Sequence, residues 1–109
     1  MKNLRFIRNV ELPPEDILMF ESDINYSQIW LCNGRKLMVA KTLKQISEIV
    51  KDAPFIRVNR QIMLNANHVK SLGNEQSIPS AELSNGLKII FSRRRATEAH
   101  NYIQNYLIN

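Results

Sequence analysis

The sequence predicts a mainly β domain, and three observations support this prediction. Asn-Gly dipeptides at 33–34 and 85–86 adjoin segments in which apolar and polar residues alternate, a pattern typical of β-hairpins. Apolar residues recur at helical spacing in only two stretches, one near the middle of the chain and one at its end. The length of 109 residues suits one compact domain with a modest core.

Pro13 and Pro14 separate a short leader, residues 1–14, from a main domain that we expect over residues 15–109. Proline lacks a backbone donor, so a pair of prolines is a natural break between two segments. The apolar content of the leader fits either an edge strand or a linker, and its pattern does not decide between them.

The main domain begins with a predicted hairpin. Ile17–Asp23 is apolar on both faces at first and then polar, as expected for a strand that leaves a core. Tyr26–Cys32 alternates, with Ile29 and Leu31 on one face. The first Asn-Gly pair then turns the chain into a return strand at Arg35–Lys41.

Two helices are expected. Thr42 is placed to cap a short amphipathic helix with apolar residues at positions 43, 46, 49 and 50, and Pro54 marks its end. The second helix is expected from about Arg94 to the end of the chain. Its apolar side consists of Ala96, Ala99, Ile103, Tyr106 and Leu107.

The chain between the two helices favours strands. Phe55–Val58 and Ile62–Leu64 are apolar runs separated by a polar tripeptide at 59–61. Val69–Leu72 reads as another short strand and residues 73–80 as a loop. The second Asn-Gly pair leads into a strand at Leu87–Phe91.

Composition narrows the class of protein. Fifteen Lys and Arg against ten Asp and Glu give a net charge of +5, which favours partners that carry phosphate. Cys32 is the single cysteine, so the chain has no internal disulfide and fits a reducing compartment. Neither a signal peptide nor a membrane-spanning apolar stretch is recognisable. We therefore expect a cytoplasmic protein that does not act at a membrane.

The residue patterns of enzyme sites are missing. His68 and His100 have no Cys, Asp or Glu beside them at metal-ligand spacing, and the three glycines stand singly in turns. Cys32 follows Trp30 and Leu31, which favours a packed thiol over a nucleophile. The sequence therefore predicts a protein that is not an enzyme and that uses no metal and no cofactor.

Three consecutive arginines lie where they do not stabilise the fold. Arg93, Arg94 and Arg95 precede the last helix, where each exposed cation opposes the helix dipole at a cost of about 0.3–1 kcal/mol. An anionic partner offsets this cost, and guanidinium groups suit both phosphate oxygens and the edge of guanine. A solvated charge run is the alternative interpretation.

Arg60 has a similar character, because Asn59 and Gln61 flank it and all three side chains can form bidentate hydrogen bonds with base edges. Lys41 and Lys44 stand on either side of the start of the middle helix and are candidates to hold phosphates. An ordinary polar turn and ordinary surface lysines are the alternatives.

Two rival functions stay open. Tyr26 and Trp30 share a strand face and would stack on bases if the domain bound RNA, although packing against a neighbouring element is the commoner role of such residues. An exposed strand edge would instead suit a protein-interaction domain that pairs with a partner chain.

The residues also match a family in their order and spacing. From about Ile17 to Tyr102 the chain resembles the LytTR DNA-binding domain, which stands at the C-terminus of many bacterial response regulators. The landmarks are Phe-Glu-Ser-Asp-Ile-Asn-Tyr at 20–26, Ile-Trp-Leu at 29–31, Asn-Gly at 33–34, Val-Ala-Lys-Thr-Leu at 39–43, Phe-Ile-Arg-Val-Asn-Arg at 55–60, Leu-Asn at 64–65, His-Val at 68–69, Gly86 and Ser-Arg-Arg at 92–94.

The resemblance implies a LytTR-like arrangement of three small, mostly antiparallel sheets, with one short helix between strands and a C-terminal helix. It also implies sequence-specific binding of double-stranded DNA by a transcriptional regulator. Loops of such a domain enter successive major grooves, read tandem direct repeats in a promoter and bend the duplex. A second copy of the chain is expected on the adjacent repeat.

The resemblance also implies residue roles. The base contacts fall on Ser27, Gln28, Asn59, Arg60 and Arg94, and the phosphate contacts on Lys41, Lys44, Gln61, Arg93 and Arg95. The chain has Asn-Arg-Gln at 59–61 where the family often has His-Arg-Ser, which changes the expected base preference but not the binding role. No receiver domain precedes the match, so we expect a stand-alone regulator or a fragment of a larger one.

Overall fold

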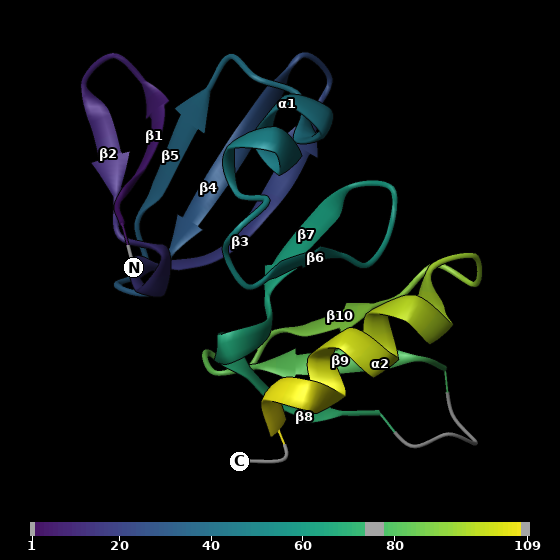
Figure 1. The fold of residues 1–109 in the computed structure, drawn as a ribbon. Helices are drawn as coiled ribbons and strands as arrows, with labels where there is room; N and C mark the ends of the chain where they lie inside the picture. The colour runs from purple at the N-terminus through teal and green to yellow at the C-terminus, as the bar shows by residue number, and fades with distance from the viewer. Residues whose placement is uncertain (1, 74–77, 108–109) are drawn as a thin grey trace.

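The computed structural model describes residues 2–73 and 78–107, which form three antiparallel sheets, two α-helices and two 3-10 turns (Figure 1). The sheets contain two, three and five strands. This confirms the mainly β prediction, including the short helix between strands and the helix near the C-terminus. No helix in these residues is long and apolar enough to cross a bilayer.

The five-stranded sheet lies at the centre of the fold. Its order is β5-β4-β3-β7-β6, with bounds β3 Ile17–Asp23, β4 Tyr26–Leu31, β5 Lys36–Val39, β6 Phe55–Arg57 and β7 Ile62–Asn65. β3 is the middle strand, and its first four residues are buried because both faces of the sheet are covered. The hairpin predicted at the first Asn-Gly pair is confirmed, since Gly34 has φ 91° and Leu31 N donates to Arg35 O at 2.8 Å.

One face of this sheet is covered by α1 (Leu43–Ile49) and by a two-stranded sheet of β1 (Leu4–Ile7) and β2 (Val10–Leu12). The Phe20 ring lies 5.4 Å from that of Phe6 and 5.2 Å from that of Phe55, so the leader contributes to this core. The boundary between leader and main domain after residue 14 stays a prediction. A 3-10 turn, η1 (Pro14–Asp16), joins the two parts.

Thr42 caps α1 as predicted. Its hydroxyl oxygen accepts from Gln45 N at 3.2 Å, and the Gln45 side chain in turn accepts from Thr42 N at 2.9 Å, which forms a capping box. The helix buries Leu43 and Ile46 on the sheet. Its position is therefore defined at one end by local hydrogen bonds and along its length by packing.

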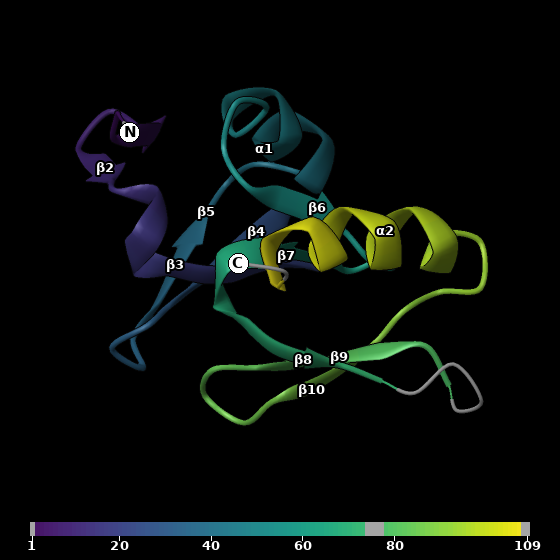
Figure 2. The same ribbon diagram turned by 60° about the horizontal axis from the view of Figure 1, so that its bottom comes forward.

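The opposite face of the sheet is covered by α2 (Ala96–Leu107) and by the three-stranded sheet β10-β9-β8 (Figure 2). The strands are β8 Val69–Leu72, β9 Ser80–Leu83 and β10 Lys88–Ile90, and η2 (Ala66–His68) leads into them from β7. Part of the predicted 73–80 loop lies outside the described residues. The apolar side predicted for the last helix includes its two buried residues, Ala99 and Ile103, whereas Leu107 is 37 % exposed because it stands at the helix end.

Candidate nucleic-acid interface

The loop between β6 and β7 is shaped by the side chain of Asn59. Its Oδ1 accepts from Gln61 N at 2.8 Å and from Ile62 N at 2.9 Å, and its Nδ2 donates to Ile90 O at 2.8 Å. The amide group therefore holds the loop closed and ties it to β10. Asn59 is half-buried, whereas Arg60 and Gln61 are exposed at the tip.

Arg57 supports the same loop from its inner side. Its Nε donates to Asn59 O at 3.3 Å and its Nη2 donates to Arg60 O at 2.7 Å. Burial and, to a lesser extent, the nearby Arg95 lower the pKa of the Arg57 guanidinium, because both disfavour the charged form. The loop that presents Arg60 is thus braced by one guanidinium and one amide.

The arginine run lies beside this loop. Ser92 N donates to Val58 O at 2.9 Å, and Arg95 N donates to Ser92 O at 3.1 Å in the turn that precedes α2. Together with the bond from Asn59 to Ile90, these contacts fasten the segment before α2 to the end of β6. Arg93 and Arg94 are exposed, and Arg95 is half-buried.

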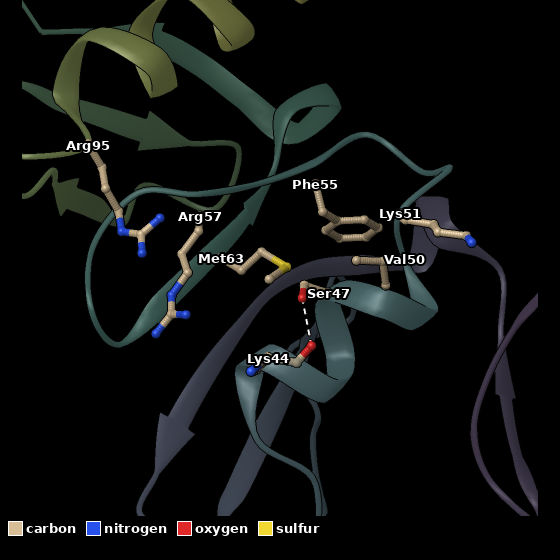
Figure 3. Close-up of a pocket in the computed structure, with 8 residues that line it drawn as sticks. All are labelled: Lys44, Ser47, Val50, Lys51, Phe55, Arg57, Met63 and Arg95. Carbon is tan, nitrogen blue, oxygen red and sulfur yellow. Dashed lines mark hydrogen bonds between the residues drawn. The ribbon is translucent and has the colours of Figure 1, made fainter.

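The side chains of Arg57 and Arg95 enter one groove of about 330 Å³. Figure 3 shows the two guanidinium groups next to each other, with Lys44 on the neighbouring helix. Lys44, Ser47 and Lys51 from α1 and its C-terminal end form one wall, and apolar side chains line the rest. Among the described residues no carboxylate lines this groove, so an anion is the partner that would relieve the repulsion between its cations.

A second groove of about 500 Å³ lies between the tips of two hairpins and the start of α1. Its lining residues are Ser22, Ile24, Thr42, Leu43, Lys44, Arg57, Arg60 and Gln61. Lys44 and Arg57 line both grooves, which places the two grooves side by side. We call the cations of these grooves, Lys44, Lys51, Arg57, Arg60 and Arg95, the basic flank.

Several residues predicted for the site lie elsewhere. Ser27 is 0 % exposed and its hydroxyl donates to Lys41 O at 2.7 Å, so its side chain is not on the surface. Gln28 is half-buried on β4 opposite Glu21 and Met38, and neither Gln28 nor Lys41 lines the two grooves.

Sequence reasoning did not assign several groove residues to the site, among them Arg57, Ser47, Lys51 and Ile24. Ser47 follows Lys44 by three positions and lies on the same face of α1, so the sequence spacing already indicated that these two residues are neighbours, whereas Lys51 lies in the turn just after the helix. Ile24 had no such signal, because its place beside Arg60 depends on how two hairpins pack.

Trp30 is engaged within the sheet. Its Nε1 donates to Glu21 Oε1 at 3.2 Å, and Lys36 Nζ lies 3.8 Å from the ring centroid. The cation over the ring occupies the face on which a base would stack. Tyr26, on the same strand, is 48 % exposed.

The expectation of a packed thiol at Cys32 is wrong, because the residue stands at the strand end and is exposed. Its Sγ lies 3.3 Å from His68 Nε2, which is also 2.7 Å from Glu15 O. A carbonyl only accepts, so Nε2 carries a proton and does not act as a base toward the thiol. Partial burial and Asp16 raise the pKa of Cys32, which is the opposite of activation.

Acidic and thiol side chains do not assemble into a metal centre in the part of the chain that the structure describes. No group of three or more His, Cys, Asp or Glu residues is placed to hold a metal ion within residues 2–73 and 78–107. The basic flank itself offers ammonium and guanidinium groups.

The three-sheet architecture and the basic flank are compatible with a small β-sheet domain that binds a polyanion such as nucleic acid. The model of the LytTr DNA-binding domain family matches residues 8–104, and the chain belongs to this family. The family assignment confirms the resemblance read from the sequence and identifies the chain as a DNA-binding domain.

A solved structure gives the same fold. The LytTr DNA-binding domain of a Bacillus cereus protein named as a methyl-accepting/DNA response regulator is similar to this chain, with a TM-score of 0.74 and 18 % identity over 93 % of this chain and 94 % of that one. At this identity the likeness concerns the fold, and it confirms the predicted arrangement of sheets. No curated protein matches the sequence.

Proposed function

We propose that this domain binds duplex DNA sequence-specifically as a transcriptional regulator in the cytoplasm and reads tandem direct repeats with loops that enter successive major grooves. The family assignment supports DNA binding itself. On adjacent repeats, a second copy of the chain would occupy the neighbouring site. The proposal rests on the basic flank and on Arg94, which is exposed on the segment before α2.

The observation that supports the proposal most directly is the attachment of two arginine-bearing segments to each other. The Ser92–Val58 and Asn59–Ile90 hydrogen bonds hold the β6–β7 loop beside the segment before α2. Arg60 and Arg94 are exposed on these two segments, and a guanidinium donates two parallel hydrogen bonds to O6 and N7 of guanine. We assign base contacts to Arg60 and Arg94.

The roles of the other predicted base contacts differ. Asn59 uses its amide within the loop, so we assign it to holding Arg60 in position. Gln28 stays a predicted base contact on the strand, and Ser27 is left out because it is buried.

Phosphate contacts are assigned to cations of the grooves. Lys44 and Arg95 line the 330 Å³ groove, whose like charges are balanced when a phosphate enters it. Arg93 and Gln61 are exposed next to Arg94 and Arg60 and stay predicted phosphate contacts, as does the half-buried Lys41. Each phosphate that the protein neutralises adds about 0.9 to the slope of log Kd against the logarithm of the salt concentration.

Selection of bound fragments from random duplex DNA, followed by measurement of Kd by fluorescence anisotropy, tests the proposal. Replacing Arg60 or Arg94 by Ala should cost about 1–3 kcal/mol on the selected duplex and relax the preference for its sequence. Lys44→Ala should weaken binding to all duplexes alike and reduce the salt slope by about 1.

Arg35→Ala is the matched control, because Arg35 is an exposed arginine in the β4–β5 turn, at the end of β4 opposite the hairpin tip that contacts the β6–β7 loop. It should change Kd by no more than about twofold, since it removes one distant, screened charge. If Arg60→Ala and Arg94→Ala both bind the selected duplex as tightly as the wild type, the assigned surface is wrong.

A further inference from the structure

Ile24 has a backbone conformation that is costly for its residue type. It stands first in the two-residue turn between β3 and β4, inside the Asp23–Tyr26 pair, and has φ 57°. In this left-handed region the branched Cβ crowds the backbone, and Gly, Asn or Asp is the usual residue at such a position. An isoleucine held there gives the turn nothing in stability.

The side chain of Ile24 is also 87 % exposed. A single exposed isoleucine is common on protein surfaces and needs no explanation by itself. One that is exposed and also held in an unfavourable backbone region contributes neither to the core nor to the turn. Such outliers occur at sites where the side chain has a role outside the fold.

The position of Ile24 indicates what that role is. Ser22 N donates to Gln61 O at 2.8 Å, so the tip of the β3–β4 hairpin is fastened to the loop that presents Arg60. Ile24 lines the 500 Å³ groove together with Lys44, Arg60 and Gln61. An apolar side chain thus stands among the groups that are suited to phosphates and base edges.

We propose that Ile24 is a specificity-determining residue that packs against the C5-methyl group of a thymine next to the base pair contacted by Arg60. The inference rests on the proposed function. In the major groove the thymine methyl is the apolar group among hydrogen-bond donors and acceptors. Arg60 and Gln61 can satisfy donors and acceptors, and Ile24 supplies the apolar surface that the methyl requires.

Replacement of thymine by deoxyuridine tests this contact, because it removes the methyl group and leaves every hydrogen-bonding atom of the base pair in place. Each thymine of the duplex selected by the wild-type protein is replaced in turn, and Kd is measured for the wild type and for Ile24→Gly. Glycine accepts the left-handed backbone without strain, so the variant keeps the turn.

At one thymine the wild type should lose about fourfold in affinity, the equivalent of one buried methyl group. Ile24→Gly should bind the two duplexes equally at that position, and at all other thymines the two proteins should respond alike. The wild-type measurements need no variant, so they stand even if the substitution changes the protein in another way.

Three outcomes overturn the inference. In the first, the Kd of the wild type changes by less than twofold when deoxyuridine replaces any thymine. In the second, the sensitive thymine affects the Kd of Ile24→Gly as much as that of the wild type. In the third, Ile24→Gly weakens binding to all duplexes by one common factor, which indicates a contact with sugar or a loosened turn. Ile7→Thr, on the exposed side of β1, is the control for loss of a surface isoleucine and should match the wild type throughout.

The failure of this inference is separable from that of the proposed function. If Arg60→Ala loses affinity while deoxyuridine has no effect, the reading surface stands and the role of Ile24 is wrong. If no duplex is selected at all, the proposed function is wrong and the thymine contact falls with it.

Discussion

Replacement of Asn59 by Ala tests whether this side chain shapes the β6–β7 loop or contacts a base. The substitution removes three hydrogen bonds, to Gln61 N, Ile62 N and Ile90 O. At about 0.5–1.5 kcal/mol each, and with Asn59 half-buried, the loss in the free energy of unfolding should be about 2–3 kcal/mol. A small domain has about 5–15 kcal/mol in total, so this loss is readily measured.

Asn59→Asp separates the two halves of the interaction. It keeps acceptors for Gln61 N and Ile62 N but places a second carboxylate oxygen where Nδ2 donates to Ile90 O at 2.8 Å. The carboxylate oxygen then faces the carbonyl oxygen of Ile90, and this repulsion adds to the loss of the donor, so the expected cost is about 2–3 kcal/mol, similar to that of Ala. Both variants should therefore be less stable than the wild type.

Urea unfolding followed by circular dichroism gives these free energies, and anisotropy on the selected duplex gives Kd under conditions in which each variant is folded. Asn67→Ala, at an exposed asparagine of η2, is the control and should stay within about 0.5 kcal/mol of the wild type. The reasoning is refuted if Asn59→Ala leaves the unfolding free energy unchanged and still loses DNA affinity, since that combination defines a direct contact.

Two further predictions concern α1 and Cys32. Thr42→Ala removes half of the capping box and should cost about 0.5–2 kcal/mol in urea unfolding, whereas Thr42→Ser keeps the oxygen and should cost less; equal losses would contradict the capping role. Because burial and Asp16 raise the pKa of Cys32, its reaction with iodoacetamide should reach half its maximal rate at a higher pH than in the urea-unfolded chain. The unfolded chain then ionises first, so stability falls as pH rises through the ordinary thiol pKa, and Cys32→Ser should remove that fall; an equal or lower midpoint in the folded protein would contradict the shift.

Features with a local cause could be predicted from the sequence. The Asn-Gly turn at 33–34 needs residues that accept positive φ, and the cap at Thr42 needs a hydroxyl three residues before a glutamine. Both signals lie within four residues of the structure they form. The strands around them could be predicted because the alternation of apolar and polar residues indicates which face of a strand is buried.

The candidate site was harder to predict because its contacts join distant segments. Asn59 and Ile90 are 31 positions apart, and nothing near either residue indicates the bond between them. The burial of Ser27 is a different case. The alternation that turns Ile29 and Leu31 toward the core places Ser27 on the same face, so the pattern itself argued against a base contact there.

The central sheet is shared by two separately packed layers, and the basic flank draws on both. Lys44 comes from the layer that contains α1, whereas Arg95 precedes the helix of the layer on the other side. A polyanion bound by both side chains links the two layers, so local unfolding of either layer would release the polyanion. Binding of DNA should for that reason slow the exchange of backbone amide hydrogens in both layers at once.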